Sequence, residues 1–545
     1  MDKPFAITLD PGSSLANRTG SWRTLRPAYS DHLPPCNNAC PTGENIQAWL
    51  YHAESGRYED AWRALVRDNP MPAVTGRVCY HPCENACNRG RLDESVSIHA
   101  VERFLGDEAI AKGWTFEPPP QRSGKRVLVV GAGPSGLAAA YHLARFGHEV
   151  EIREAGPMAG GMMRFGIPKY RLPREVLDAE VRRIEALGVT IRLNAKVDSL
   201  LKARDEGGFD AAFVAVGAHL SKRAWVPAGE AARIMDALSV LRGVEMGEKP
   251  LLGRRVLVYG GGNTAIDVAR TARRLGAEEA VIIYRRTRDR MPAHDSEVQE
   301  ALDEGVMFRW LSTIKMGTDS AAGETFTIEK MALDDTGFPQ PTGEFETIEA
   351  DSLVLALGQE VDLSLLDDVK GLTLHNGVVK VDAHMMTDCP GIFAGGDMVP
   401  SERTVTVALG HGKKAARYID AWLRGTRVED TPKHSLASFE RLNPWYYTDA
   451  PRTVQAELER ARRESSFDEV VSGLNADNAL FEARRCLSCG NCFECDNCYG
   501  VCPDNAVIKL GPGKRFSINL DYCKGCGLCA EECPCGAIDM VPESI

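Results

Sequence analysis

The sequence lacks a long apolar run. No stretch of its 545 residues reaches the ~18 consecutive apolar residues that a membrane-spanning helix needs. The first ten residues also lack the basic region, apolar core and small-residue cleavage site of a secretory signal. We therefore expect a cytoplasmic protein without membrane insertion.

The sequence also lacks an excess of positive charge. It carries 64 Lys and Arg against 76 Asp and Glu, a net charge of -12, and no basic stripe would offset repulsion from phosphates. This argues against nucleic acid as a partner and matches basic redox proteins better. The length suggests about three or four domains, with the 26% charged and 44% hydrophobic residues of an ordinary soluble protein.

The 17 cysteines gather near both ends of the chain. Disulfides are rare in a reducing compartment, so the clustering indicates metal ligation. Five cysteines within about fifty residues are explained better by iron–sulfur ligation than by small core residues. This N-terminal set is Cys36, Cys40, Cys79, Cys83 and Cys87.

A nucleotide-binding pattern begins at Arg126, where an apolar strand runs into a G-x-G-x-x-G turn and a helical segment. The first glycine permits the tight turn, the second lets the backbone approach a pyrophosphate, and the third allows close helix–strand packing. An acidic residue ends the next strand, where it is placed to hydrogen-bond a ribose hydroxyl. The cofactor-binding candidates are Gly131, Gly133, Pro134, Ser135, Gly136 and Glu154.

Later segments contribute to the same unit. The glycine- and proline-rich stretch 160–173 would allow close approach to a flavin ring, with a plain surface loop as the alternative. Two buried strands end in glycine turns, and a third delivers an aspartate beside glycines. The helix that follows has an N-terminal dipole suited to a flavin carbonyl or phosphate. The candidates are Gly161, Gly217, Gly358, Gly396, Asp397 and Thr404.

A second strand, glycine turn and helix begin at Arg255. Alanine stands in place of the third glycine, which the pattern tolerates because only a small residue is needed. Arginines end the next strand where an NAD site usually has an acid, which favours NADP(H), with a solvated surface run as the alternative. The candidates are Gly260, Gly262, Asn263, Thr264, Ala265, Arg285, Arg286 and Arg290.

The tail repeats the pattern C-x2-C-x2-C-x3-C-P twice, as in bacterial two-cluster ferredoxins. Structural zinc uses separated pairs and does not account for this repeat. In the ferredoxin arrangement, three cysteines of one run bind a cluster with the fourth cysteine of the other run. The two predicted sets are Cys492, Cys495, Cys498 and Cys533, and Cys523, Cys526, Cys529 and Cys502.

The region from about Cys36 to Lys414 resembles the glutamate synthase small-subunit family of flavoproteins. Relatives of that family include the N-terminal half of dihydropyrimidine dehydrogenase and the large subunit of NADH-dependent ferredoxin:NADP oxidoreductase. The matching segments are Cys40–Pro41, Gly76–Cys79, Cys83–Cys87, Val96–Ile98, Gly131–Leu137, Gly166–Pro173, Tyr284–Arg286, Met291–Ala293 and Gly395–Asp397.

The resemblance implies FAD in the first unit, NAD(P)H in the second, and two 4Fe-4S clusters in an N-terminal helical domain. By the family's pattern, one of these clusters has three cysteine ligands and one non-cysteine ligand. These positions fall here on Cys40, Cys79, Cys83 and Glu102.

The chain departs from the family at its N-terminus, which lacks the usual Arg-Cys-x-x-Cys pair before Cys36. Cys36 and Cys87 are thereby two ligands short of a cluster. A pair with the usual flanks, Cys486 and Cys489, occurs just before the ferredoxin repeat. We hypothesise that this pair folds back to complete the cluster, which gives four 4Fe-4S clusters and leaves Cys389 and Cys535 free.

The predicted class is α/β, with two nested Rossmann-like dinucleotide-binding domains, a preceding α-helical iron–sulfur domain and a following ferredoxin-like domain with two 4Fe-4S clusters. Residues up to about 30 are expected to be irregular. The predicted boundaries are 1–117 for the helical domain, 118–222 and 355–430 for the FAD-binding domain, 223–354 for the NAD(P)H-binding domain, 431–480 for a connector and 481–545 for the ferredoxin domain.

These parts predict a flavin-containing electron-transfer subunit of an oxidoreductase. A nicotinamide carries two electrons and a cluster carries one, so a flavin must stand between them. No acid–base residue is assigned as catalytic. No domain remains for an organic substrate, so we expect a catalytic partner, for example a 2-oxoacid or aldehyde oxidoreductase or a glutamate synthase large subunit, or a ferredoxin.

Three alternatives remain open at this stage. The chain could be a glutamate synthase small subunit, or a subunit of an electron-bifurcating transhydrogenase. It could also be a non-catalytic electron wire or assembly module, although the intact glycine turns speak against decayed nucleotide sites.

Overall fold

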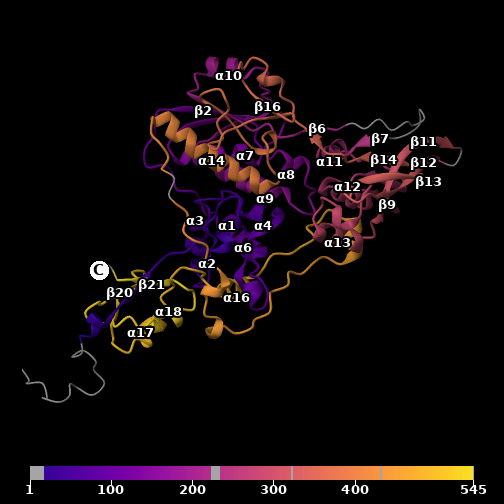
Figure 1. The fold of residues 1–545 in the computed structure, drawn as a ribbon. Coiled ribbons are helices and arrows are strands. Elements are labelled where there is room, and N and C mark those ends of the chain that lie inside the picture. Colours follow the sequence, from indigo (N-terminus) through magenta and orange to yellow (C-terminus); the bar gives the residue numbers. More distant parts are fainter. Residues whose placement is uncertain (1–17, 223–233, 321–322, 430–431, 544–545) are drawn as a thin grey trace, which may run out of the picture.

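The computed structural model describes residues 18–222, 234–320, 323–429 and 432–543 (Figure 1). The N-terminal helices lie between two parallel-sheet units and a small tail unit (Figure 1). Short 3-10 turns accompany these units: η1 (Thr19–Trp22), η2 (Asn88–Arg91), η3 (Arg288–Arg290), η4 (Ser364–Leu366), η5 (Gly396–Met398), η6 (Phe439–Arg441) and η7 (Pro444–Tyr446).

The N-terminal unit is a bundle of short helices around a core that includes the fully buried Trp49 and Trp62. A Cβ on Gly106 would lie 2.3 Å from the backbone nitrogen of Ala73, so this glycine permits two of the helices, α4 and α6, to pack closely. The close packing brings Glu102 of α6 against α4. The helices are α1 (Pro35–Ala39), α2 (Ile46–Ala53), α3 (Tyr58–Leu65), α4 (Pro72–Val78), α5 (Pro82–Asn85) and α6 (Ile98–Ala111).

The first nucleotide unit contains a five-stranded parallel sheet in the order β18-β5-β2-β3-β4. Its central strands are buried on both faces, which explains their continuous apolar sequences. The strands are β2 (Arg126–Val130), β3 (Glu149–Arg153), β4 (Thr190–Arg192), β5 (Ala211–Val214) and β18 (Ile392–Ala394). The helices are α7 (Pro134–Arg145), α8 (Met162–Phe165), α9 (Arg174–Glu185), α10 (Leu200–Gly207) and α14 (Val405–Arg424).

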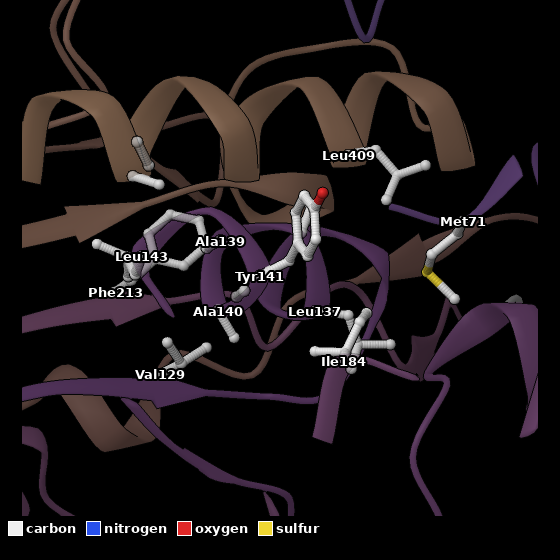
Figure 2. Close-up of a cluster of buried hydrophobic side chains, with 14 of the residues drawn as sticks. Met71, Val129, Leu137, Ala139, Ala140, Tyr141, Leu143, Ile184, Phe213 and Leu409 are labelled. Atoms are coloured by element: carbon white, nitrogen blue, oxygen red, sulfur yellow. The ribbon is translucent and has the colours of Figure 1, made fainter. Parts of the chain in front are cut away.

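One apolar core joins this sheet to its covering helices and to the N-terminal bundle. Figure 2 shows Val129 and Phe213 of the sheet, Leu137 of α7 and Leu409 of α14 in this layer. Met71, just before α4, belongs to the same core. The helical unit is therefore packed directly against the first nucleotide unit.

The second nucleotide unit has a parallel sheet in the order β10-β9-β8-β14-β7 and a three-stranded antiparallel sheet in the order β11-β12-β13. The antiparallel sheet was not predicted. The strands are β7 (Ile234–Asp236), β8 (Arg255–Tyr259), β9 (Glu279–Ile283), β10 (Met307–Arg309), β11 (Ser312–Ser320), β12 (Gly323–Leu333), β13 (Pro339–Ala350) and β14 (Ser352–Leu355). The helices are α11 (Ala237–Glu245), α12 (Asn263–Arg274) and α13 (Asp295–Asp303).

The chain leaves the first unit, builds the second and then returns to the first with β18 and α14, so the predicted nesting of the two parallel sheets and the α/β class are confirmed. Two small antiparallel sheets accompany this crossing: β6 (Leu220–Ser221) pairs with β15 (Gln359–Glu360), and β16 (Leu374–His375) forms a hairpin with β17 (Val378–Val379).

The tail unit includes a strand from the opposite end of the chain. Strand β1 (Leu25–Tyr29) pairs antiparallel with β21 (Ile538–Pro542), so the expectation of irregular chain up to about residue 30 is wrong for this segment. Arg23 supports the pairing through a 2.7 Å ion pair with Glu543. The remaining tail elements are β19 (Val507–Lys509), β20 (Phe516–Ile518), α17 (Asn497–Gly500) and α18 (Leu528–Glu531).

The segment predicted as a connector runs along the other units. Its helix α15 (Arg460–Ser465) packs against α12, where Glu464 pairs with Arg273 at 2.8 Å. Glu469 then pairs with Arg77 of α4 at 2.7 Å, and α16 (Ala476–Arg484) packs on the helical bundle. The connector thus ties the second nucleotide unit to the N-terminal helices.

Candidate functional site

Both glycine turns open into one continuous cavity of about 1010 Å³. Its wall combines the carboxyl ends of both parallel sheets, the positions at which such sheets bind ligands. The predicted residues that line it are Gly131, Gly133, Pro134, Ser135, Glu154, Gly161, Gly217, Gly260, Gly262, Asn263, Thr264, Arg285, Arg286, Arg290, Gly358, Gly396, Asp397 and Thr404.

Two predicted cofactor residues, Gly136 and Ala265, lie behind the cavity wall. A Cβ on Gly136 would lie 2.0 Å from the carbonyl oxygen of Gly131, so this glycine serves helix–strand packing. Ala265 is fully buried in the core of the second unit. Neither residue lines the cavity.

The first glycine turn forms an open cradle for a phosphate group. Gly131 has a φ of 103°, and a Cβ on Gly133 would meet nothing nearer than the Cα of Gly161, 3.9 Å away. The Ser135 hydroxyl is buried and has no hydrogen-bond partner in the described ranges. An open backbone, an unpaired hydroxyl and the start of α7 match the needs of a pyrophosphate.

Glu154 follows β3 directly and is held by two backbone groups. The Ala132 N–H donates to Oε2 at 2.8 Å, and the Gly156 N–H donates to Oε1 at 2.7 Å. These bonds fix the carboxylate beside the glycine turn, where the fingerprint requires a ribose-binding acid.

Asp397 and Thr404 lie at the returning end of the first unit. Burial raises the pKa of Asp397, and the nearby Arg403 opposes this rise. The Thr404 hydroxyl accepts a 3.2 Å hydrogen bond from the Val407 N–H and so caps α14. The N-terminus of a long helix therefore points its free N–H groups toward the cavity wall.

The second turn leaves space for a second nucleotide, because a Cβ on Gly262 would meet no atom within 4 Å. Asn263, the first residue of α12, is already engaged by the protein. Its Nδ2 donates to the Tyr80 hydroxyl at 2.6 Å, and its Oδ1 accepts from the His294 N–H at 3.0 Å. Gln359 donates to the hydroxyl of Thr264 at 3.2 Å.

The predicted arginine run is divided between free and paired side chains. Arg288 pairs with Asp295 at 2.7 Å. Arg285 and Arg286 form no ion pair with any carboxylate in the described parts of the chain, and the Nε of Arg286 is buried without a partner. Unpaired arginines in the cavity wall fit an anionic group such as a 2′-phosphate.

Three cysteines and a glutamate form the helical group: Cys40, Cys79, Cys83 and Glu102. Burial raises the pKa of the Cys83 thiol, with further increases from Cys79, Cys40 and Glu102. Burial likewise raises the pKa of Cys79, which Glu102 and Cys40 raise further. The structure therefore brings together the four residues that the resemblance assigns to one cluster.

Glu102 has the environment of a fixed, buried ligand. Its Oε1 accepts hydrogen bonds from the Thr75 hydroxyl and from Asn69 Nδ2, the latter at 3.0 Å. Its pKa is raised by burial and by the neighbouring Glu44, which the same Asn69 amide contacts at 2.9 Å. The carboxylate is thus oriented by α4 while it faces the cysteines.

Residues from both ends of the chain form the junction group: Cys36, Cys87, Cys486 and Cys489. Burial raises the pKa of Cys36, with further contributions from the three other thiols. Burial and the same kind of thiol neighbours raise the pKa of Cys486. The proximity that the hypothesis requires is therefore present.

The members of each predicted tail set lie near one another. The first tail group is Cys492, Cys495, Cys498 and Cys533. Burial raises the pKa of the first three thiols, and the neighbouring Cys533 raises it further. The second tail group, Cys502, Cys523, Cys526 and Cys529, lines a small cavity of its own. All sixteen predicted metal ligands thus fall into four sets of four.

The two remaining cysteines differ in position. Cys389 donates to the carbonyl of Lys370 at 3.3 Å and belongs to none of the four groups. Cys535 is buried with its sulfur 3.7 Å from that of Cys533, beside the first tail group. Four soft thiolates, or three with one carboxylate, form a donor set that suits iron–sulfur clusters.

The sequence analysis missed a clamp between the two nucleotide units. In the stretch 160–173, Tyr170 is fully buried, so the surface-loop alternative is wrong. Arg171 pairs with Asp267 of α12 at 2.9 Å and also with Glu297 of α13. The segment Gly166–Pro173 matched the family, but nothing in its local sequence shows that Arg171 contacts the second unit; Arg171 and Gly161 both line the cavity.

Two glycine turns on one cavity, with cysteine sets at both ends of the chain, define a dinucleotide-dependent iron–sulfur oxidoreductase. Residues 125–412, more than half of the chain, match the pyridine nucleotide-disulphide oxidoreductase family, and the chain belongs to this family. Residues 29–114 match the 4Fe-4S domain II of dihydropyrimidine dehydrogenase, and residues 491–537 match a 4Fe-4S dicluster domain. FAD, NAD(P)(H) and 4Fe-4S clusters are therefore its cofactors.

Two of the similar proteins are beta subunits of oxidoreductases. The beta subunit of NADP(+)-dependent formate dehydrogenase from Moorella thermoacetica is 37% identical over 499 residues, 84% of this chain and 70% of that protein. The beta subunit of NADPH-Fe(3+) oxidoreductase from Geobacter sulfurreducens is 35% identical over 508 residues, 84% of this chain and 75% of that protein.

The resemblance to glutamate synthase small subunits is confirmed. The small chain of the NADPH glutamate synthase from Escherichia coli is 30% identical over 426 residues, 72% of this chain and 89% of that protein. Among the helices of the described ranges, none has both the length and the apolar character needed to cross a bilayer.

Proposed function

We propose that the chain is an NADP(H)-dependent flavoprotein subunit that exchanges electrons with a partner through four 4Fe-4S clusters. The observation that carries the proposal is the shared cavity, because it allows two dinucleotides to meet between the glycine turns of the two sheets. The four cysteine-containing groups supply ligands for one-electron carriers on the side of the helical and tail units.

The residues of the first unit would hold FAD. The turn at Gly131 and Gly133 and the Ser135 hydroxyl would bind its pyrophosphate, and Glu154 would accept a hydrogen bond from the ribose. Asp397 and the capped start of α14 would contact the flavin end. When bound, the flavin converts hydride chemistry into single-electron chemistry.

The second unit would hold NADPH in preference to NADH. Arg285 and Arg286 are available to a 2′-phosphate, while Arg288 is neutralised by Asp295. The names of the similar formate dehydrogenase, iron(III) oxidoreductase and glutamate synthase subunits agree with this preference, since each refers to NADP(+) or NADPH.

The ligand sets would be the helical group, the junction group and the two tail groups. In the junction group, Cys486 and Cys489 would replace the N-terminal pair that the chain lacks. The domain boundaries would be those given above, and the junction group would take ligands from both the helical domain and the ferredoxin domain. The partner would be a catalytic subunit or a ferredoxin, and two of the similar proteins named above are themselves beta subunits. The many thiols would favour a reducing compartment, the cytoplasm.

Anaerobic mixing of the purified protein with NADPH or NADH tests the proposal. NADPH should bleach the flavin absorbance at a lower concentration than NADH, and the broad iron–sulfur absorbance should then decrease. Iron and sulfide analysis should give about sixteen of each per chain. A colourless protein, or a flavin that neither nicotinamide reduces, would overturn the proposal.

A further inference from the structure

Tyr80 links the helical unit to the second nucleotide unit. It directly follows Cys79 of the helical group, and its ring stacks on the ring of His294 with a centroid distance of 3.4 Å and an interplanar angle of 11°. Tyr80 also lines the shared cavity. One residue therefore touches both the nucleotide unit and the segment that carries a candidate cluster ligand.

The contact is fixed by the glycine turn of the second unit. Asn263 donates to the Tyr80 hydroxyl at 2.6 Å and accepts from the His294 N–H at 3.0 Å, so a single amide holds both stacked residues. Asn263 follows Gly262 immediately. A nucleotide phosphate at this turn would therefore lie next to the group that positions the Tyr80 ring.

His294 is also joined to the arginine segment. It ends the stretch that begins with Arg285, and its neighbour Ala293 donates to the carbonyl of Gly261 at 3.1 Å. The Tyr284 hydroxyl holds the carbonyl of Arg290 at 2.8 Å. Both elements expected to bind NADP(H), the turn and the arginine run, thus meet at the Tyr80 stack.

On its other side, Tyr80 continues into the cysteine segment. Helix α4 ends at Val78, and the His81 N–H donates to the Cys79 sulfur at 3.3 Å. A displacement of the Tyr80 ring would move its own backbone. The adjacent residues Cys79 and His81, which position this sulfur, would move with it. Hydrogen bonds and geometry at a ligating sulfur tune the potential of a cluster.

We propose that Tyr80 is a positioning residue that couples nucleotide binding at the second glycine turn to the redox potential of the helical group. The coupling rests on the proposed function, because it takes Cys79 as a cluster ligand and the second turn as the NADP(H) site. Thermodynamic linkage makes it reciprocal: a nucleotide that shifts the potential binds the oxidised and reduced states with different affinities.

The test is an anaerobic redox titration of the full-length holoprotein, followed by electron paramagnetic resonance. The probe is 2′-phospho-ADP-ribose, which lacks the nicotinamide and cannot accept a hydride. Its addition should shift the midpoint potential of one cluster signal. The shift should correspond to a difference of about fivefold or more between the affinities of the oxidised and reduced states for the probe. Glu102→Gln should change the shape of the same signal, which assigns it to the helical group.

Tyr80→Phe removes the hydroxyl bound by Asn263, and His294→Gln removes the stacked ring from the other unit. Each variant should lose at least half of the shift. Tyr58→Phe is the matched control, because it removes one hydrogen bond from the helical unit, to the carbonyl of Ala476 in α16 at 3.0 Å, away from the Tyr80 contact. This control should retain the whole shift.

The outcomes separate the coupling from the proposed function. If NADPH fails to reduce the flavin of the unmodified protein, the proposed function fails. If NADPH reduces the flavin but the probe shifts no cluster signal, the coupling alone is overturned. A shift that survives in both Tyr80→Phe and His294→Gln also overturns it, since neither contact would then be needed.

Discussion

Asn88 Nδ2 donates a hydrogen bond of 3.4 Å to the sulfur of Cys489, which lies 401 residues further along the chain. The same amide donates to the carbonyl of Ala437 at 2.9 Å. Asn88 directly follows Cys87, so a residue beside one N-terminal thiol holds a thiol from the tail. This contact connects the two halves of the junction group.

Replacement of both tail thiols of the junction group should remove one cluster. Cys486→Ser with Cys489→Ser leaves only Cys36 and Cys87, so we expect a loss of about four irons per chain. Iron and sulfide analysis with the intensity of the reduced cluster signals measures this loss. Cys389→Ser is the control, because this thiol lies outside the four groups. Unchanged iron in the double variant would contradict the junction hypothesis.

Neutralisation of the unpaired arginines should change the choice of nicotinamide. Arg285→Gln with Arg286→Gln removes two charged donors that face the cavity, so the KM for NADPH should rise about tenfold or more while that for NADH changes little. Steady-state reduction of an artificial acceptor gives both constants. Arg288→Gln, which breaks the pair with Asp295 and a 3.3 Å hydrogen bond to Gln299, should leave the ratio of the two constants unchanged. An equal loss for both nicotinamides would argue against 2′-phosphate recognition.

Removal of the clamp should loosen the second nucleotide unit. Arg171→Met leaves Asp267 and Glu297 buried without their cation, which costs about 3–5 kcal/mol. We expect a lower unfolding temperature and faster proteolysis of residues 234–355, measured on the anaerobic protein. Arg182→Met, on the exposed side of α9, is the control. A clamp variant as stable as the control would show that the ion pairs do not hold the units together.

The buried Glu180 should make stability depend on pH. Burial raises its pKa from 4.5 to about 7, while Arg183 and the Ala73 N–H oppose the rise. Because the folded pKa lies above the unfolded one, the protonated carboxyl stabilises the fold below pH 4.5, and this contribution is lost as the pH rises through 7.

Glu180→Gln keeps an acceptor for the Ala73 N–H but cannot ionise. Relative to this variant, the unmodified protein should lose on the order of 3 kcal/mol of unfolding free energy between pH 4.5 and 8. Thermal unfolding at several pH values checks the difference. Glu175→Gln, an exposed change on the same helix, should show no such trend. Parallel curves for the Glu180 variant and the unmodified protein would refute the assignment.

Local patterns sufficed for the parts of the fold that are built from neighbouring residues. The turn at Gly131, the turn at Gly260 and the repeated tail cysteines each carry their chemistry within about fifteen residues, so spacing alone placed them. The predicted division of the tail thiols also rests on spacing, because the two-cluster arrangement fixes which fourth cysteine joins each run.

Contacts between distant segments could not be predicted in this way. The pairing of β1 with β21 joins two five-residue strands whose sequences contain no sign of each other. Arg171 belongs to the matched segment Gly166–Pro173, but nothing local shows that its partners are Asp267 and Glu297. The proximity of Cys36 to Cys486 was inferred from missing ligands, which is an argument from chemistry and not from the chain's periodicity.

The cluster proposed at the junction group would impose an order on biosynthesis. At 5–20 residues per second, a ribosome needs about 20 to 80 seconds to pass from Asn88 to Cys489. Throughout that interval the nascent chain presents two thiols without their counterparts, and a truncated product never acquires them. On the proposed ligand assignment, iron can reach the junction group only after the ribosome has passed Cys489, so that the segment around Cys486 and Cys489 becomes a condition for maturation of the helical unit.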